Sequence, residues 1–259
     1  MIILLSPSKG QDFDPNPIEK SSQPVFLTES ERLVSELKKY KPSQIQQLMS
    51  ISENLAELNY QRFQDFKLPL TLGSAKQAAL AFKGDVYTGL EASTLSHDDL
   101  DFAQKHLRIL SGLYGYLKPL DLILPYRLEM KTKLQNSEGE NLYQFWDMKI
   151  TDLINKELND DSDFVVNLAS NEYFKSVKKA KVNRPILTLN FKDTKDGKTR
   201  VIGFYAKRAR GMMARALIQN RVNCISEIKQ IVIDNYRYNE ALSTTHDWVY
   251  ERTQPKPKT

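Results

Sequence analysis

The sequence predicts an α/β protein with a mixed sheet that is flanked by helices. Apolar runs at residues 2–5 and 164–168 are each followed by small polar residues, which is typical of strands buried on both faces. Residues 193–198 form a hairpin signal between two more strand candidates, at 186–191 and 200–205. Helical patterns alternate with these strands, so a mixed sheet fits better than a purely parallel one.

The helices are predicted from caps and apolar spacing. Thr28 and Glu31 form a capping box, Pro42 suits a second helix start, and residues 52–66 form a third helix. Ser96 caps a helix whose apolar stripe runs through Leu110, so we expect that helix to reach Ser111. Later elements are helices at 142–158 and 206–221 and a last hairpin that pairs 236–238 with 248–250.

Composition bounds the class of protein. The chain has 259 residues, 41% of them hydrophobic, and a net charge of +5, which suits one domain over 1–252 with a disordered tail at 253–259. A single cysteine, Cys224, fits a reducing compartment, so we expect a cytoplasmic protein, and we expect a monomer. No run approaches a signal peptide or a membrane span, so no membrane partner is expected.

The helix at 206–221 carries the clearest charge pattern. Residues 175–215 hold thirteen Lys or Arg and two Asp, a net charge of +11. On this helix Lys207, Arg208, Arg210 and Arg215 fall on one broad arc without an acidic residue, and Gly211 lies among them. This pattern favours phosphate binding with close approach to the backbone at Gly211; the alternative is a solvated helix face.

A glycine turn at residues 111–118 is a second candidate for anion binding. Gly112 and Gly115 permit close approach of a phosphate, Ser111 lies at the expected helix end, and Arg108 and Lys118 flank the turn. The alternative is a glycine-bearing loop between core elements. We expect Lys9, Lys83, Arg108, Lys118 and Lys207 to converge on one groove.

Lys83 and Asp85 are the candidate catalytic residues. They lie two apart on an extended segment, so they point to one side, and such a pair can serve covalent chemistry or proton transfer. A structural ion pair is the alternative. Glu129 and Glu172, near strand ends, are possible partners.

Several signatures are missing from the sequence. The three histidines have neither ligand spacing nor cysteine companions, so no metal site is predicted. Neither a Gly-x-Gly-x-x-Gly motif after a strand nor a Walker loop occurs, so no cofactor is predicted.

Several long sequence blocks span nearly the whole chain, at residues 82–90, 107–121, 125–130, 143–146, 167–174 and 204–211. In their residues and in their order, these blocks resemble the bacterial YaaA family of peroxide stress proteins. The resemblance implies a cytoplasmic role in the peroxide response that limits free iron and the damage it does to DNA. It also implies a mixed-sheet fold that binds DNA through a basic cleft with a helix-hairpin-helix element, for which residues 110–118 match best, with one residue more between the glycines.

Three functions follow as hypotheses. The first is a DNA-binding stress protein that contacts phosphates largely without reading sequence, and tyrosines in the groove stack on distorted or single-stranded segments. The second is an enzyme that acts on a nucleobase or nucleoside with Lys83 and Asp85, and the third is direct iron sequestration. The DNA contacts of the first hypothesis are Lys9, Lys83, Arg108, Ser111, Gly112, Gly115, Lys118, Lys207, Arg208, Arg210, Gly211 and Arg215.

Overall fold

The computed structural model describes residues 1–255, and an eight-stranded sheet forms its centre. The strands of this sheet are β1 (Ile2–Leu5), β5 (Leu107–Ser111), β6 (Gly115–Leu117), β8 (Val165–Asn167), β9 (Ile186–Lys195), β10 (Lys198–Arg200), β11 (Arg237–Asn239) and β12 (Asp247–Thr253). They follow the order β11-β12-β9-β8-β1-β5-β6, and β10 pairs with β9 outside this path. Two small separate sheets pair β2 (Gly10–Gln11) with β4 (Phe82–Lys83) and β3 (Lys76–Gln77) with β7 (Leu122–Ile123).

The five central strands are parallel, and the antiparallel strands lie outside them. β12, β9, β8, β1 and β5 are parallel neighbours, whereas β6, β10 and β11 pair antiparallel. β1 lies between β8 and β5, which explains its unbroken apolar sequence, since all four of its residues are buried. The predicted α/β class with a mixed sheet is therefore confirmed.

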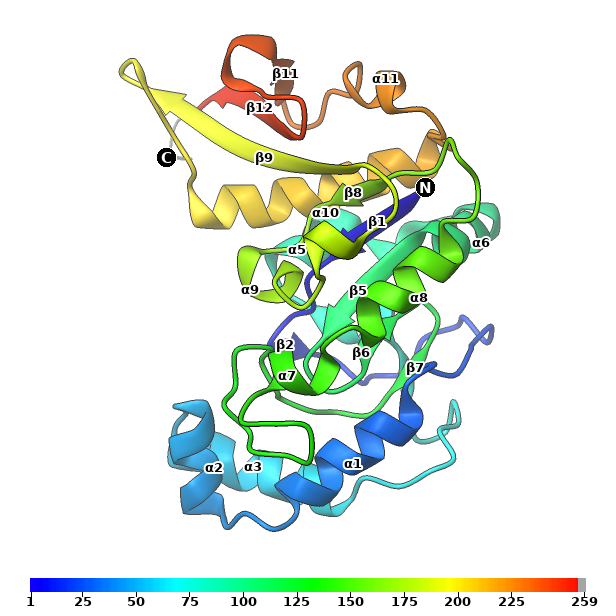
Figure 1. Ribbon diagram of the computed structural model, residues 1–259, viewed down its shortest axis with the longest axis vertical. Coiled ribbons are helices and arrows are strands. Elements are labelled where there is room, and N and C mark those ends of the chain that lie inside the picture. The colour runs from blue at the N-terminus through cyan, green and yellow to red at the C-terminus, as the bar shows by residue number, and fades with distance from the viewer. Residues whose placement is uncertain (256–259) are drawn as a thin grey trace.

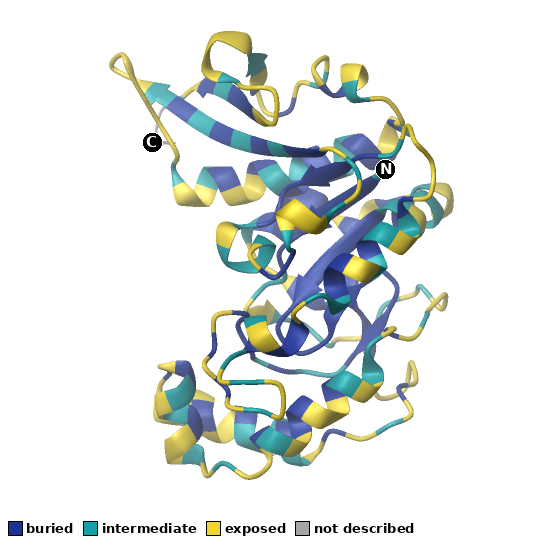
Figure 2. Cartoon of the chain, viewed as in Figure 1, coloured by how far each residue is buried: buried dark blue, intermediate teal, exposed yellow. Residues whose placement is uncertain are grey.

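Eleven α-helices in the described part of the chain accompany the sheet. They are α1 (Leu27–Leu37), α2 (Pro42–Met49), α3 (Glu53–Gln64), α4 (Ala78–Ala81), α5 (Asp85–Leu90), α6 (His97–His106), α7 (Leu142–Trp146), α8 (Lys149–Glu157), α9 (Asn171–Phe174), α10 (Gly203–Gln219) and α11 (Ile225–Ile228). In Figure 1, α8 lies in front of the sheet and α10 behind it, while α1 to α3 form the end of the molecule farthest from β11 and β12. Figure 2 shows that the central strands are the most continuously buried elements. No helix within residues 1–255 has the length and apolarity needed to cross a membrane.

The predicted helix-hairpin-helix element is a β-hairpin instead. α6 ends at His106, and the next residues form β5, which pairs with β1 in parallel and with β6 antiparallel. All residues of β5 are buried. An apolar run of this length is compatible with a buried strand as well as with the end of a helix, and the open edge of β1 decides for the strand.

Other boundaries differ in smaller ways. The predicted helix at 142–158 is two helices, because Asp147 adopts a left-handed φ of 31° between α7 and α8. The predicted strand at 200–205 is short, since α10 begins at Gly203. Both predicted hairpins are present. The predicted disordered tail starts too early, because Thr253 belongs to β12; residues 256–259 lie outside the described part.

Candidate functional site

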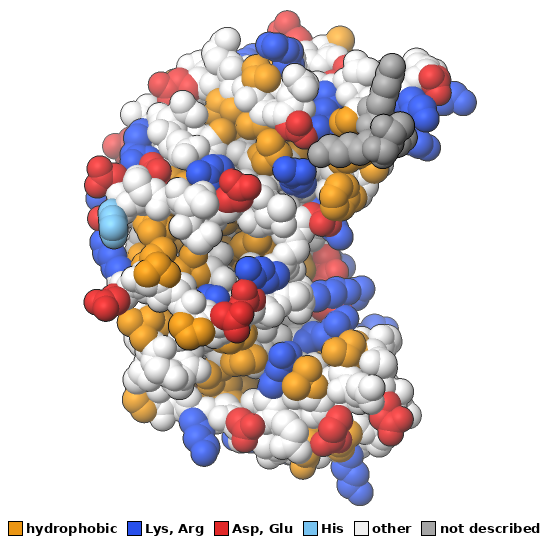
Figure 3. Space-filling view, turned by 180° about the vertical axis from the view of Figure 1, so that it is seen from behind, with side chains coloured by type: hydrophobic (Ala, Val, Ile, Leu, Met, Phe, Trp, Pro, Cys, Tyr) orange, Lys and Arg blue, Asp and Glu red, His pale blue; other side chains and the backbone are white. Residues whose placement is uncertain are grey.

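A cleft of about 790 Å³ opens where β1 and β8 end. Because the two strands are parallel neighbours, the loops that follow them meet at one edge of the sheet, where open α/β sheets place ligands. Besides these two loops, the walls come from α10, the start of α5, and the segment that contains Glu129 and Lys131. Figure 3 shows the molecule hollowed along one edge, with Lys and Arg side chains gathered there. The residues that line the cleft are Ser6, Pro7, Ser8, Lys9, Gly84, Asp85, Val86, Glu129, Lys131, Ser170, Asn171, Glu172, Tyr173, Asn190, Val201, Lys207 and Arg210.

The two strand-end loops are held together by hydrogen bonds. The Ser170 backbone N–H donates to Ser6 Oγ at 2.8 Å, and the two serine hydroxyls lie 3.3 Å apart. The hydroxyl of Tyr87 donates to the Ser6 carbonyl at 3.0 Å. The floor of the cleft is therefore fixed before a ligand arrives, which lowers the entropic cost of binding.

Glu129 is the centre of a charged cluster on one wall. Its carboxylate lies 2.8 Å from Lys9 Nζ, 3.6 Å from Arg127 Nη2 and 3.8 Å from Lys131 Nζ. Lys131 Nζ is also 4.0 Å from Glu172. Three cations around one buried carboxylate leave this wall without an uncompensated negative charge at Glu129.

α10 lines another part of the cleft and supplies cations that differ from those around Glu129. Within residues 1–255, neither Lys207 nor Arg210 forms an ion pair, and the same is true of Arg208 next to them. Arg210 is half-buried, its buried Nε has no hydrogen-bond partner in the described chain, and burial lowers its pKa. A guanidinium group whose buried Nε has no partner favours an anionic ligand, because a paired charge is less costly to bury.

Gly211 and Arg215 do not face this cleft. A Cβ atom on Gly211 would lie 1.7 Å from the Val86 carbonyl oxygen, so the bare position lets α10 pack directly on α5. Arg215 Nη1 donates to the carbonyls of Leu90 and Glu91 at 3.0 and 2.9 Å, at the end of α5. The prediction that a phosphate approaches Gly211 was wrong, because the backbone that comes close is the protein's own.

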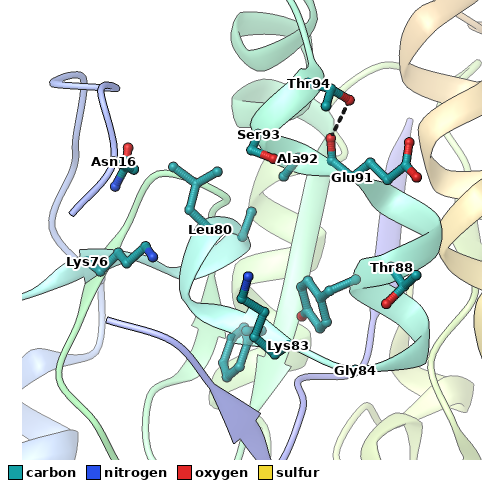
Figure 4. A pocket seen from close by; sticks show the side chains of 13 residues that line it. Asn16, Lys76, Leu80, Lys83, Gly84, Thr88, Glu91, Ala92, Ser93 and Thr94 are labelled. Carbon is teal, nitrogen blue, oxygen red and sulfur yellow. Dashed lines mark hydrogen bonds between the residues drawn. The ribbon is translucent and has the colours of Figure 1, made fainter. Parts of the chain in front are cut away.

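Lys83 and Asp85 lie in different pockets. Asp85 lines the cleft, whereas Lys83 lines a neighbouring pocket and forms an ion pair with Asp12 at 2.9 Å. Gly84 between them has a φ of 123°, so the alternation of an extended strand is interrupted there. Lys83 and Arg210 consequently do not share the cleft, although Gly84 borders both spaces. Figure 4 shows Gly84 next to Lys83 in the neighbouring pocket.

The residues predicted at the glycine turn are almost all buried in the core. Arg108 is 3% exposed and pairs with Glu157 at 2.8 Å. Ser111 is fully buried and accepts hydrogen bonds from the backbone N–H groups of Leu113 and Tyr114. Added Cβ atoms would strike the Leu128 carbonyl at Gly112 and the Trp146 ring at Gly115. These four residues cannot contact DNA as predicted, and partly exposed Lys118 lies 4.0 Å from Glu157 and does not line the cleft.

Most of the tyrosines considered for base stacking are also in the core. Tyr87, Tyr114, Tyr116 and Tyr126 are buried, whereas Tyr173 lines the cleft. Phe204, on the first turn of α10, is an exposed aromatic residue with 56% accessibility. Metal binding gains no support, since residues 1–255 contain no group of three His, Cys, Asp or Glu side chains that could hold an ion.

Some cleft residues were not predicted as site residues, among them Ser8, Lys131, Asn171 and Asn190. The small polar residues after the two buried strands were the usable signal for the loops. Lys131 and Asn190 lacked such a signal, because only the fold brings them to this edge.

The fold and the cleft define an α/β protein with a polar, cation-bearing site at the carboxyl ends of parallel strands. Residues 1–242 match the family described as peroxide stress protein YaaA, to which this chain belongs. The chain is 52% identical over 256 residues to a UPF0246 protein of Colwellia psychrerythraea, covering 98% of this chain and 100% of the relative. It is 51% identical over 256 residues to a UPF0246 protein of Teredinibacter turnerae, with the same coverage of both chains.

Proposed function

We propose that this peroxide stress protein binds DNA along the cleft, as a cytoplasmic monomer, through phosphates and without reading base sequence. The observation that carries the proposal is the group of cations on α10. Lys207, Arg208 and Arg210 have no ion-pair partner within residues 1–255, and α10 contains no acidic residue. Solvated helix faces normally mix both signs of charge, so an unpaired group favours a polyanionic partner.

Two parts of the cleft lining differ in charge. Phosphates would contact α10, where Lys207 and Arg210 have no ion-pair partner within residues 1–255. Glu129 and Glu172 also line the cleft, but Lys9 and Lys131 offset their charges. This part of the cleft therefore repels a DNA backbone less than its carboxylates alone would. Such contacts position a protein on DNA but do not select a sequence.

In the peroxide response, bound DNA would be shielded from oxidation driven by iron. Limitation of free iron remains part of the proposal as what the family resemblance implies. Direct iron sequestration has no support from the part of the chain that the structure describes, because no suitable ligand group occurs there.

The test is the affinity of a fluorescein-labelled duplex for variants of α10. Lys207→Ala and Arg210→Ala should each weaken binding about tenfold or more, since a lost charge-assisted hydrogen bond costs about 1.5–3 kcal/mol. Lys67→Ala is the matched control, because Lys67 is an exposed lysine just after α3, outside the cleft. Equal affinity for all three variants and the wild type would contradict the proposal.

A second candidate function, action on a nucleobase, rests on Asp85. This carboxylate lines the same cleft as Lys9, so an acid and an amine face one space. Lys83, the amine first considered, lines the other pocket. Borohydride trapping on DNA that contains damaged bases tests this alternative. A trapped adduct that disappears in Lys9→Ala would favour it, and the absence of an adduct would contradict it.

A further inference from the structure

A second pocket, separate from the cleft, lies on the other side of Gly84. It has a volume of about 350 Å³, near the lower end of the range of about 300–1,000 Å³ for small-molecule sites. Figure 4 shows the amino groups of Lys76 and Lys83 directed toward its centre. Glycine is favoured at this boundary because Gly84 has a φ of 123°, a backbone conformation that other residues rarely adopt.

The two lysines share one carboxylate. Asp12 Oδ2 is 2.9 Å from Lys83 Nζ, and Asp12 Oδ1 is 3.7 Å from Lys76 Nζ. The Asp14 backbone N–H and then Lys83 lower the pKa of Asp12 to about 2, so Asp12 is ionised at neutral pH. Glu91 also borders the pocket, but its side chain points away from both lysines in Figure 4. Lys76, Lys83 and Asp12 together therefore carry one net positive charge.

Lys76 is the unusual member of this pair. Its side chain is only 9% exposed, and its sole ion pair within residues 1–255 is the 3.7 Å contact with Asp12. A lysine is rarely buried unless it is paired closely. An anion in the pocket would supply the missing partner.

The remaining lining selects among anions. Thr88 and Ser93 provide hydroxyl donors, whereas the Thr94 hydroxyl already donates to the Glu91 carbonyl at 2.9 Å. Leu80 and Phe82 provide an apolar surface. A phosphate group presents three acceptor oxygens and nearly two negative charges at pH 7, which matches two ammonium groups and two hydroxyls. We infer that this pocket binds a phosphate monoester of a small molecule, with the phosphate on Lys76 and Lys83 and the organic group against Leu80.

The test uses inorganic phosphate and adenosine monophosphate as probes in amide NMR titrations of the whole protein. Saturable shifts are expected at Gly84, Thr88 and Ser93, and Lys76→Met should weaken binding about tenfold or more, because a charged hydrogen-bond donor is lost. Lys83→Met, at an exposed lysine, is the second variant should Lys76→Met fail to fold. Lys67→Met should bind as the wild type does.

The contrary results are equally definite. Absence of saturable shifts, or equal affinity in both pocket variants and the control, would overturn the inference. If adenosine monophosphate displaces inorganic phosphate but a DNA strand without terminal phosphates does not, the result supports a small-molecule ligand. Displacement by the strand would instead assign the pocket to DNA and overturn the small-molecule assignment. The result does not depend on whether the cleft itself binds DNA.

Discussion

Gly211 of α10 packs directly against the Val86 carbonyl of α5, where an added Cβ atom would lie 1.7 Å from the oxygen. Gly89 makes the reciprocal contact, since its Cβ would lie 2.2 Å from the Arg208 carbonyl. Two glycines thus set the distance between these helices. Because α10 carries Lys207 and Arg210 and α5 begins at Asp85, the same contact positions these cleft residues relative to one another.

Gly211→Ala should therefore destabilise the fold. Overpacking of this kind costs about 1–3 kcal/mol or more in the free energy of unfolding. Gly203→Ala is the control, because no atom lies within 4 Å of its added Cβ and alanine favours the helix. Urea denaturation followed by circular dichroism measures both. Unchanged stability of Gly211→Ala with weaker DNA binding would instead restore the interpretation that a phosphate approaches this glycine.

Asp121 should make stability depend on pH. Its carboxyl accepts hydrogen bonds from Ser22 Oγ at 2.6 Å and from the Lys118 backbone N–H at 2.7 Å, and burial raises its pKa to about 6. Because the folded-state pKa is the higher one, the folded protein binds the proton more tightly than the unfolded chain. The stabilisation that protonated Asp121 gives the folded state is fully present below about pH 4 and is lost as the pH rises through about 6. This is a change of roughly 3 kcal/mol in the free energy of unfolding.

Asp121→Asn removes this titration. The unfolding free energy of the wild type should decrease relative to that of the variant between pH 4 and pH 7. Urea denaturation of both proteins at each pH measures this difference. A difference that stays constant over this range would show that Asp121 does not titrate in this way.

Phe204 should govern any preference for unpaired DNA. It is exposed and precedes Lys207 and Arg208 by three and four residues, so it lies on the same side of α10 as these cations. Stacking on an aromatic side chain contributes about 1–3 kcal/mol per base. Phe204→Ala should weaken single-strand binding by about fivefold or more and leave duplex binding unchanged. Phe204→Trp should retain single-strand affinity, and equal losses on both DNA forms would argue against stacking.

The sequence was sufficient for the fold class because buried strands and hairpins leave local patterns. Ile2–Leu5 is apolar at every position, and the turn at Asp196–Gly197 is marked by its residue types. It was insufficient at Leu107–Ser111, where helical spacing and a buried strand produce the same apolar run. Pairing with β1 decides that case, and pairing is a long-range property.

The candidate site was predictable in part for the same reason. Lys9 and Lys207 were expected to converge and do line one cleft. The sequence alone could not distinguish buried Arg108 from an exposed cation, because its burial depends on pairing with Glu157, 49 residues away. Gly211 among arginines signals a close approach, but the sequence does not state that a second helix makes it.

The salt dependence of duplex binding tests the central claim most directly. If about four cations of the cleft and of α10 contact phosphates, the slope of log K against log salt should be roughly −3 to −4. Lys207→Ala and Arg208→Ala should each reduce the slope by about one and weaken different sequences alike, whereas Lys67→Ala should leave it unchanged. A wild-type slope near zero, or no binding at low salt, would contradict the proposal that this cleft binds DNA.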